Sequence, residues 1–177
     1  KRKQGKIKFY GMATWECFRA DDNSPQYLSL QDTFNLAQEV GGKDHGFRFI
    51  QLPYNMHYDQ ALLKQNQKFD GSKISILEAS SKLGIGVFTS VPFMQGRLLS
   101  PGVMPEFNNL KPSIRALQFI RSTPGVLAPL VGQKTKEHVS ENLEIMKIPP
   151  IPENLEIMKI PPIPEDKFLT LVKQLTS

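Results

Sequence analysis

The sequence is constrained most strongly by short apolar runs that recur at a regular interval and alternate with helical patterns. Runs rich in β-branched and aromatic residues begin near residues 7, 47, 85 and 126, about 40 residues apart. A segment with apolar residues at helical spacing lies between each pair of runs. This alternation of strands and helices predicts an α/β protein with a parallel sheet.

Start and stop signals place the helices between these strands. Ser29 and Ser75 each precede an acidic residue by three positions, as in a capping box, and open the first two helices. The predicted helices are residues 30–40, 75–83, 112–120 and a last one from about residue 136 to before Pro149. In the last helix, Val139, Leu143 and Met146 form the apolar face that we expect to be buried.

The four strand–helix units limit the fold without deciding how the sheet closes. The run 85–91 is continuously apolar between Gly84 and Pro92, which is typical of a parallel strand covered on both faces. Four such units fit half of an eight-stranded barrel, and they also fit a small open doubly wound sheet. Periodicity alone does not separate these two alternatives.

Charge and cysteine content restrict the function classes. The net charge of +5 is accounted for by five cations among the first eight residues, which leaves a neutral body. A nucleic-acid or anionic-membrane binder normally carries its charge across a folded face, so we expect neither partner. No apolar run reaches the roughly 18 residues of a membrane span, and Cys17 is the single cysteine. We expect a cytoplasmic protein without a disulfide or a metal site.

An exact repeat occurs near the carboxyl terminus. Residues 141–152 are repeated without a change at 153–164. Solenoid repeats are longer and diverge, so this duplication does not indicate a repeat fold. One helix surface can bury one copy, and we therefore expect the second copy to be a surface excursion within a tail, residues 149–177, that follows a domain of residues 1–148.

Four motifs in order resemble a known family. They are GKIKFYGM at 5–12, FIQLPYN at 49–55, VPFMQGRL at 91–98, and Val131-Gly132 followed by EHVSENL at 137–143. Together they resemble the second half of the aldo-keto reductases, over residues 3–148. The resemblance implies a (βα)8 TIM barrel, of which this chain supplies a half barrel, and an NADPH-dependent oxidoreductase that reduces aldehydes or ketones. NADP(H) binds in that family at the carboxyl ends of the strands without a Rossmann motif, and this sequence has none.

The resemblance assigns the nicotinamide end of the cofactor to the ends of the first three strands. Gln51 lies where the family's glutamine holds the carboxamide. Thr14 keeps one hydroxyl of a pair that is usually Ser-Asn, whereas Ala13 departs from that pair. Ser90 stands where the family commonly has a stacking aromatic ring, so stacking on the nicotinamide is not implied here.

The same resemblance assigns the phosphates and the adenosine to later residues. Val91, Pro92, Phe93, Met94 and Gln95 follow the segment that wraps the pyrophosphate. The residues assigned to the adenosine 2′-phosphate and adenine are Gly132, Lys134, Thr135, His138, Glu141 and Asn142. A cation such as Lys134 before a helix favours NADP(H) over NAD.

The family's catalytic Asp, Tyr, Lys and His come from the other half of the barrel, so no catalytic residue is assigned. His57, Tyr58 and Asp59 with Lys64 contain the four residue types, but consecutive residues point in different directions, and we interpret the cluster as coincidence. The partners implied are a small carbonyl substrate and the amino-terminal half of the barrel, in the same polypeptide or a separate chain. A non-catalytic NADP(H)-sensing regulatory subunit and a degenerate or split remnant are the alternative functions.

Overall fold

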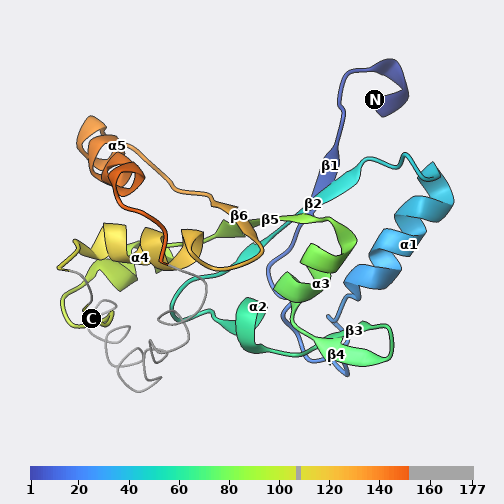
Figure 1. Cartoon of the computed structure of the whole chain (residues 1–177), viewed down its shortest axis with the longest axis horizontal. Coiled ribbons are helices and arrows are strands. Elements are labelled where there is room, and N and C mark those ends of the chain that lie inside the picture. The colour runs from blue at the N-terminus through green and yellow to red at the C-terminus, as the bar shows by residue number, and fades with distance from the viewer. Residues whose placement is uncertain (107–108, 152–177) are drawn as a thin grey trace.

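A four-stranded parallel sheet organises the chain. In this computed structural model, which describes residues 1–106 and 109–151, the strand order is β1-β2-β5-β6 (Figure 1). The strands are β1 (Tyr10–Ala13), β2 (Phe47–Pro53), β5 (Gly86–Ser90) and β6 (Val126–Pro129). Each neighbouring pair is parallel. The predicted parallel α/β sheet is therefore confirmed, and within the described residues β1 and β6 are its edge strands.

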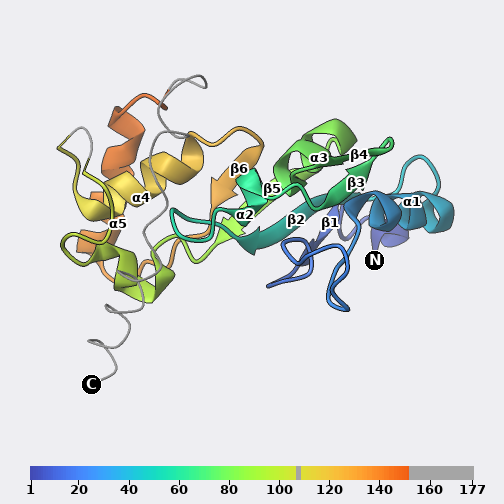
Figure 2. The ribbon, with the colours of Figure 1, turned by 90° about the horizontal axis from the view of Figure 1, so that it is seen from below.

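Helices connect the strands as the alternation predicts. They are α1 (Leu30–Gly41), α3 (Ile76–Leu83), α4 (Pro112–Arg121) and α5 (Lys136–Leu143). The hydroxyls of Ser29 and Ser75 accept the N–H groups of Asp32 and Glu78, at 3.1 and 3.2 Å, so both predicted caps form. Figures 1 and 2 show α1 towards one end of the sheet, and α4 and α5 side by side at the other.

Several short elements were not predicted. They are the 3-10 helices η1 (Arg2–Gln4) and η2 (Met94–Leu99), the short helix α2 (Gln60–Leu63), and the antiparallel hairpin of β3 (Gln67–Phe69) and β4 (Ser72–Ile74). The hairpin turns at Asp70 and Gly71, whose φ angles are 47° and 81°. An Asp-Gly pair favours this left-handed turn, so the sequence did contain a signal for it. The first strand begins at Tyr10 rather than near residue 7.

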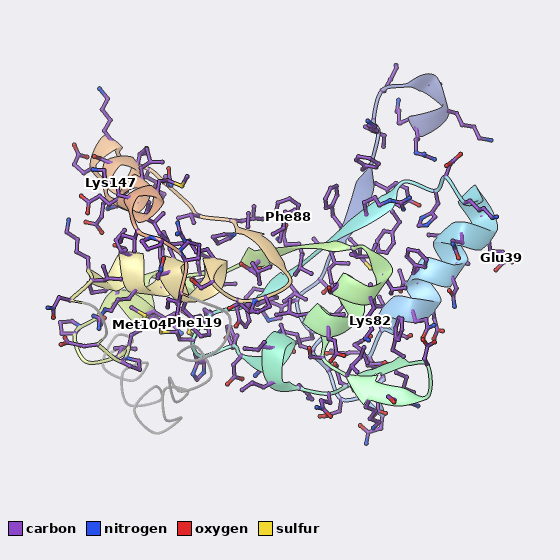
Figure 3. The ribbon with its side chains drawn as sticks, viewed as in Figure 1. Glu39, Lys82, Phe88, Met104, Phe119 and Lys147 are labelled. Carbon is purple, nitrogen blue, oxygen red and sulfur yellow. The ribbon has the colours of Figure 1, made fainter. Side chains whose placement is uncertain are left out.

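The sheet buries one of its two faces. Ile50, Leu52 and Val87 point into the core, where they join Ile76 and Leu77 of α3. The opposite face, which we call the open face, carries Gly11, Ala13, Phe49, Gln51, Phe88 and Leu127, and each of these residues is at least partly exposed. Figure 3 shows Phe88 on the side of the sheet away from α3. The apolar run of β5 predicted a strand covered on both faces. The described residues cover only one of these faces.

Aromatic rings lie across the open face. The Phe49 ring lies 6.2 Å from the ring of Phe9 and 5.5 Å from that of Phe88, measured between centroids. A Cβ atom at Gly86 would lie 3.0 Å from the Phe49 ring and 3.1 Å from Leu127. Glycine at this position thus lets the two side chains approach over the strand.

The carboxyl-terminal part of the described chain packs on α4 with an unexpected face. Leu143 and Met146 are 57% and 74% exposed, so the prediction that they form a buried apolar face is wrong. The chain leaves α5 at Leu143 and continues as the 3-10 helix η3 (Glu144–Lys147). Asn142 of α5 is buried, and because a 3-10 helix has three residues per turn, the positions that follow it on the packed side are Ile145 and Ile148.

Polar side chains of α4 hold residues 145–151 in place. The Arg121 guanidinium donates to the carbonyl oxygens of Ile145 and Ile148, and Gln118 donates to that of Pro149 at 2.6 Å. The N–H of Ile151 donates to the Ser122 hydroxyl at 2.9 Å. The packing on α4 thus extends past residue 148, through most of the first copy of the repeat. The second copy, 153–164, lies outside the described residues.

Removing one copy of the repeat should leave the fold intact, because the first copy already makes these contacts. Deleting 141–152 or 153–164 gives the same polypeptide, since the copies are identical. We expect an unchanged urea midpoint by circular dichroism, and an unfolded product would contradict this. As a control, Ile145→Ala in the single-copy chain should lower the free energy of unfolding by about 2 kcal/mol or more, since Ile145 is buried.

Candidate cofactor-binding site

Parallel pairing places three predicted site residues at the same edge of the sheet. Ala13 is the register partner of Gln51, and Pro53 is that of Ser90. The N–H of Thr14 donates to the Gln51 carbonyl oxygen at 2.9 Å. The ends of β1, β2 and β5 therefore place Thr14, Gln51 and Ser90 at the same edge, as the family resemblance implied, and their role in cofactor binding stays a prediction.

The Gln51 side chain lies on the open face with its amide available. It lines a hollow of about 230 Å³ together with Ala13, Phe49 and Phe88. The hydrogen bonds among the described residues include none to this amide. An amide offers both a donor and an acceptor, so it can pair with a second amide in the hollow.

Thr14 is bonded to Gln51 through the main chain, but it does not line the hollow with Gln51. Its Oγ1 is buried and has no hydrogen-bond partner within the described part of the chain. Buried hydroxyls nearly always have a partner, but the Thr89 hydroxyl is unpaired in the same way, so this feature is not specific to the edge with Gln51. The Gln51 amide is the group in the hollow that can both donate and accept a hydrogen bond.

The segment after β5 has an unusual backbone. Val91, Met94 and Gln95 have φ angles of 57°, 47° and 57°, and Gly96 has 92°. Left-handed residues mixed with right-handed ones direct main-chain N–H groups into concave turns that suit anions. The side chains of Pro92 and Met94 are buried and that of Phe93 is partly buried in the core. Pro92 has no main-chain N–H and that of Met94 donates to the Val91 carbonyl oxygen at 3.1 Å, so among these three residues only Phe93 can offer a main-chain N–H to a ligand.

The residues after β6 form an exposed approach to α5. Gly132, Lys134, Thr135 and His138 are all exposed. The Thr135 hydroxyl caps the helix by accepting the His138 N–H at 3.2 Å, so that hydroxyl already serves the fold. No ion pair among the described residues involves Lys134, and its ammonium is available for an anion.

Glu141 and Asn142 serve a different contact in this structure. The Glu141 carboxylate accepts a hydrogen bond from the Ser113 hydroxyl, and the Lys111 ammonium lies 3.5 Å from it. These two contacts, the hydroxyl first, lower the pKa of Glu141 below its ordinary value. Asn142 is buried in the same junction. The pair predicted to contact adenine therefore joins α5 to α4.

The residues His57, Tyr58, Asp59 and Lys64 do not converge on one point. The Tyr58 ring packs edge-on against Trp15 at 6.4 Å between centroids, and the Arg19 guanidinium lies 5.1 Å from its centre. Lys64 forms an ion pair with Asp21 at 2.8 Å, and burial raises the pKa of Asp59. This arrangement agrees with our interpretation that the cluster is coincidental.

Sequence reasoning missed Asn55, which joins two of the loops at this edge. Its buried side chain contacts the main chain of Val91, His57 and Tyr58. Asn55 ends the FIQLPYN motif, but the motif gave it no role, because its main partner lies 36 residues along the chain. The turn-forming tendency of asparagine is the one local signal that was present.

Comparison with known proteins supports the fold. No protein-family model matches the chain, and no curated protein is significantly similar to it. Among solved structures, the chain is similar to the aldo-keto reductase AKR11C1 from Bacillus halodurans in its holo form, with a TM-score of 0.50 and 12% identity. The similarity covers 89% of this chain and 63% of that one.

The identity is low, so this similarity shows the fold alone. It agrees with the predicted α/β fold of the TIM-barrel family and with the parallel sheet described above. None of the helices in the described part of the chain has the length and apolar character needed to cross a membrane. Residues 1–106 and 109–151 contain no group of three or more His, Cys, Asp or Glu side chains placed to hold a metal ion.

Replacing Ser113 with Ala should raise the pKa of Glu141, because the Ser113 hydrogen bond is the largest cause of its depression. A carboxylate with a lowered pKa in the folded state stabilises the fold above about pH 4.5 and loses that contribution as the pH falls through its folded pKa. The variant should therefore lose less stability on acidification. Carbon-detected NMR titration of Glu141 measures the shift, and an unchanged pKa would contradict the assignment.

Proposed function

We propose that this chain is the cofactor-binding part of a cytoplasmic, NADPH-dependent aldo-keto reductase that reduces small aldehydes or ketones. The observation that carries the proposal is the Gln51 amide, which lines a hollow near the carboxyl ends of adjacent parallel strands and has no hydrogen-bond partner within the described residues. Ligands of parallel α/β folds bind at this edge. The similarity to a holo aldo-keto reductase supports the choice of family as an analogy of fold.

In this proposal, different residues of the chain bind different parts of the cofactor. Gln51 pairs with the carboxamide of the nicotinamide, and Thr14 supplies its hydroxyl at the same end. In the left-handed turn at 91–95, main-chain N–H groups that are not already bonded, such as that of Phe93, receive the phosphates, and Lys134 meets the 2′-phosphate. NADPH, when bound, supplies the hydride for carbonyl reduction.

The buried Tyr54 is not suited to act as the proton donor. Tyr54 is buried, its hydroxyl shares a hydrogen bond with the Thr123 hydroxyl at 3.0 Å, and burial raises its pKa. A tyrosine acting as a general acid at neutral pH needs the opposite shift. We therefore propose that the rest of a barrel, in the same polypeptide or in a partner chain, supplies the acid.

The open face and the free edges support such a partner. Parallel sheets are normally covered on both faces, whereas here Phe49, Phe88 and Leu127 remain partly exposed. The edge strands β1 and β6 also have unpaired main-chain groups within the described residues. Further parallel strands paired to both edges would cover the open face and enclose the hollow beside Gln51, where the small carbonyl substrate would bind.

The single tryptophan gives a direct test of cofactor binding. Trp15 follows Thr14, and its side chain is 55% exposed. NADPH added to the chain should quench Trp15 fluorescence in a saturable way. Binding followed by reduction of an aldehyde would show that the polypeptide tested contains a complete reductase. Binding without reduction would show that it supplies the cofactor-binding part alone. Absence of binding, even beside a chain that completes the barrel, would refute the proposal.

Replacing Gln51 with Ala should weaken NADPH binding by about 1 to 3 kcal/mol, because the carboxamide loses both of its hydrogen bonds. The fold should stay intact, since the Gln51 amide makes no bond within the described residues. Trp15 titration measures the affinity. Gln38→Ala, at an exposed position on α1, is the matched control and should have no effect. Equal NADPH affinities for the Gln51 variant and the parent chain would show that Gln51 does not belong to the site.

Replacing Lys134 with Ala should weaken NADPH binding more than NADH binding, because the lysine interacts with the 2′-phosphate that NADH lacks. We expect a loss of about 1 kcal/mol or more for NADPH, and little change for NADH. Lys147→Ala, an exposed lysine on η3, provides the control for lost charge. Equal losses for both cofactors would show that Lys134 does not read the 2′-phosphate.

A further inference from the structure

We infer that Asn55 is a positioning residue that holds Val91 in its left-handed conformation and so sets the path of residues 91–95. The inference rests on the proposed function, since it concerns the segment proposed to receive the cofactor's phosphates. Asn55 is fully buried. Its side chain is placed between the loop after β2 and the loop after β5.

The Asn55 amide uses its donor and its acceptor at once. Its Nδ2 donates to the Val91 carbonyl oxygen at 2.8 Å. Its Oδ1 accepts the N–H groups of His57 and Tyr58, each at 2.8 Å. An apolar residue could do neither, and a carboxylate at this position could accept but not donate.

Val91 needs such a contact because its local sequence opposes its conformation. Its φ of 57° lies in the left-handed region, where a β-branched side chain collides with the main chain. Val91 also precedes Pro92, and a residue before proline favours extended backbone. Local preferences thus predict a continued strand at Val91, so a tertiary contact must compensate for the turn.

The frame around Asn55 is rigid enough to impose this turn. The Tyr54 N–H donates to the Ser90 carbonyl oxygen at 3.2 Å, and the Tyr54 hydroxyl is bound to Thr123. The residues immediately before Asn55 and Val91 are therefore fixed to each other. Asn55 follows Gln51 by four residues, so the clamp also relates the proposed carboxamide site to the proposed phosphate site.

A mutant cycle on the stability of the chain tests the clamp without any cofactor. Asn55→Ser keeps a short acceptor for the turn but does not reach Val91, whereas Val91→Gly accepts a positive φ without help. Asn55→Ser should raise the unfolding equilibrium constant at least fivefold more in the parent chain than in the Val91→Gly variant. Equal effects in the two chains would overturn the inference. Asn35→Ser, at an exposed position on α1, should show no coupling.

The same variants test the consequence for the cofactor. Asn55→Ser should weaken NADPH binding at least tenfold, and adding Val91→Gly should restore the affinity to within threefold of the parent chain. Unrestored binding would overturn the positioning role. If Asn55→Ser does not fold, recovery of folding in the double variant with Val91→Gly supports the clamp. If the double variant does not fold either, the cycle is run with Asn55→Asp in place of Asn55→Ser. If the parent chain does not bind NADPH, the proposed function fails, whereas the stability cycle still decides the clamp.

Discussion

Parallel pairing of β2 with its two neighbours is the constraint on which the rest of the structure depends. Because parallel strands run in one direction, their carboxyl ends meet at one edge, and residues far apart in sequence become neighbours there. Thr14 follows β1, whereas Gln51 and Ser90 lie near the ends of β2 and β5, yet register and main-chain hydrogen bonds place the three at one edge. An antiparallel arrangement would have placed these residues at opposite edges.

Buried polar side chains fix the loops at that edge. Asn66 donates to the carbonyl oxygens of Phe18 and Ala20, and Gln67 accepts the N–H of Leu30 at 2.9 Å. These bonds hold the loop between β1 and α1 against the β3–β4 hairpin, while Asn55 does the same for the loop after β5. Each uses a side-chain amide, which can satisfy main-chain donors and acceptors that no strand reaches. The loops around the proposed site are thus ordered by a few amides rather than by regular structure.

The sequence predicted the elements whose signals are local. Hydrophobic runs located the strands, and capping serines located the starts of α1 and α3. Met146 was misjudged because the chain changes from α-helical to 3-10 spacing at Glu144, and an apolar pattern does not reveal that change. Leu143 was misjudged because α5 turns its neighbour Asn142 to the buried side instead. The family resemblance implied the positions of Gln51 and Thr14 at the strand ends, and their role in cofactor binding stays a prediction. Asn55 was not predicted, because its role depends on a contact with Val91 in a distant loop.

The position of Gln51 links cofactor binding to the covering of the open face. Register places Gln51 between Ala13 and Phe88, with Ala128 beyond, so a single amide interrupts an apolar row. When further strands cover this row, the amide leaves water and must find a partner or cost about 1 to 3 kcal/mol. A carboxamide in the adjacent hollow provides that partner. In the proposed function, therefore, completing the barrel strengthens the need for the cofactor, and the cofactor in turn stabilises the completed barrel.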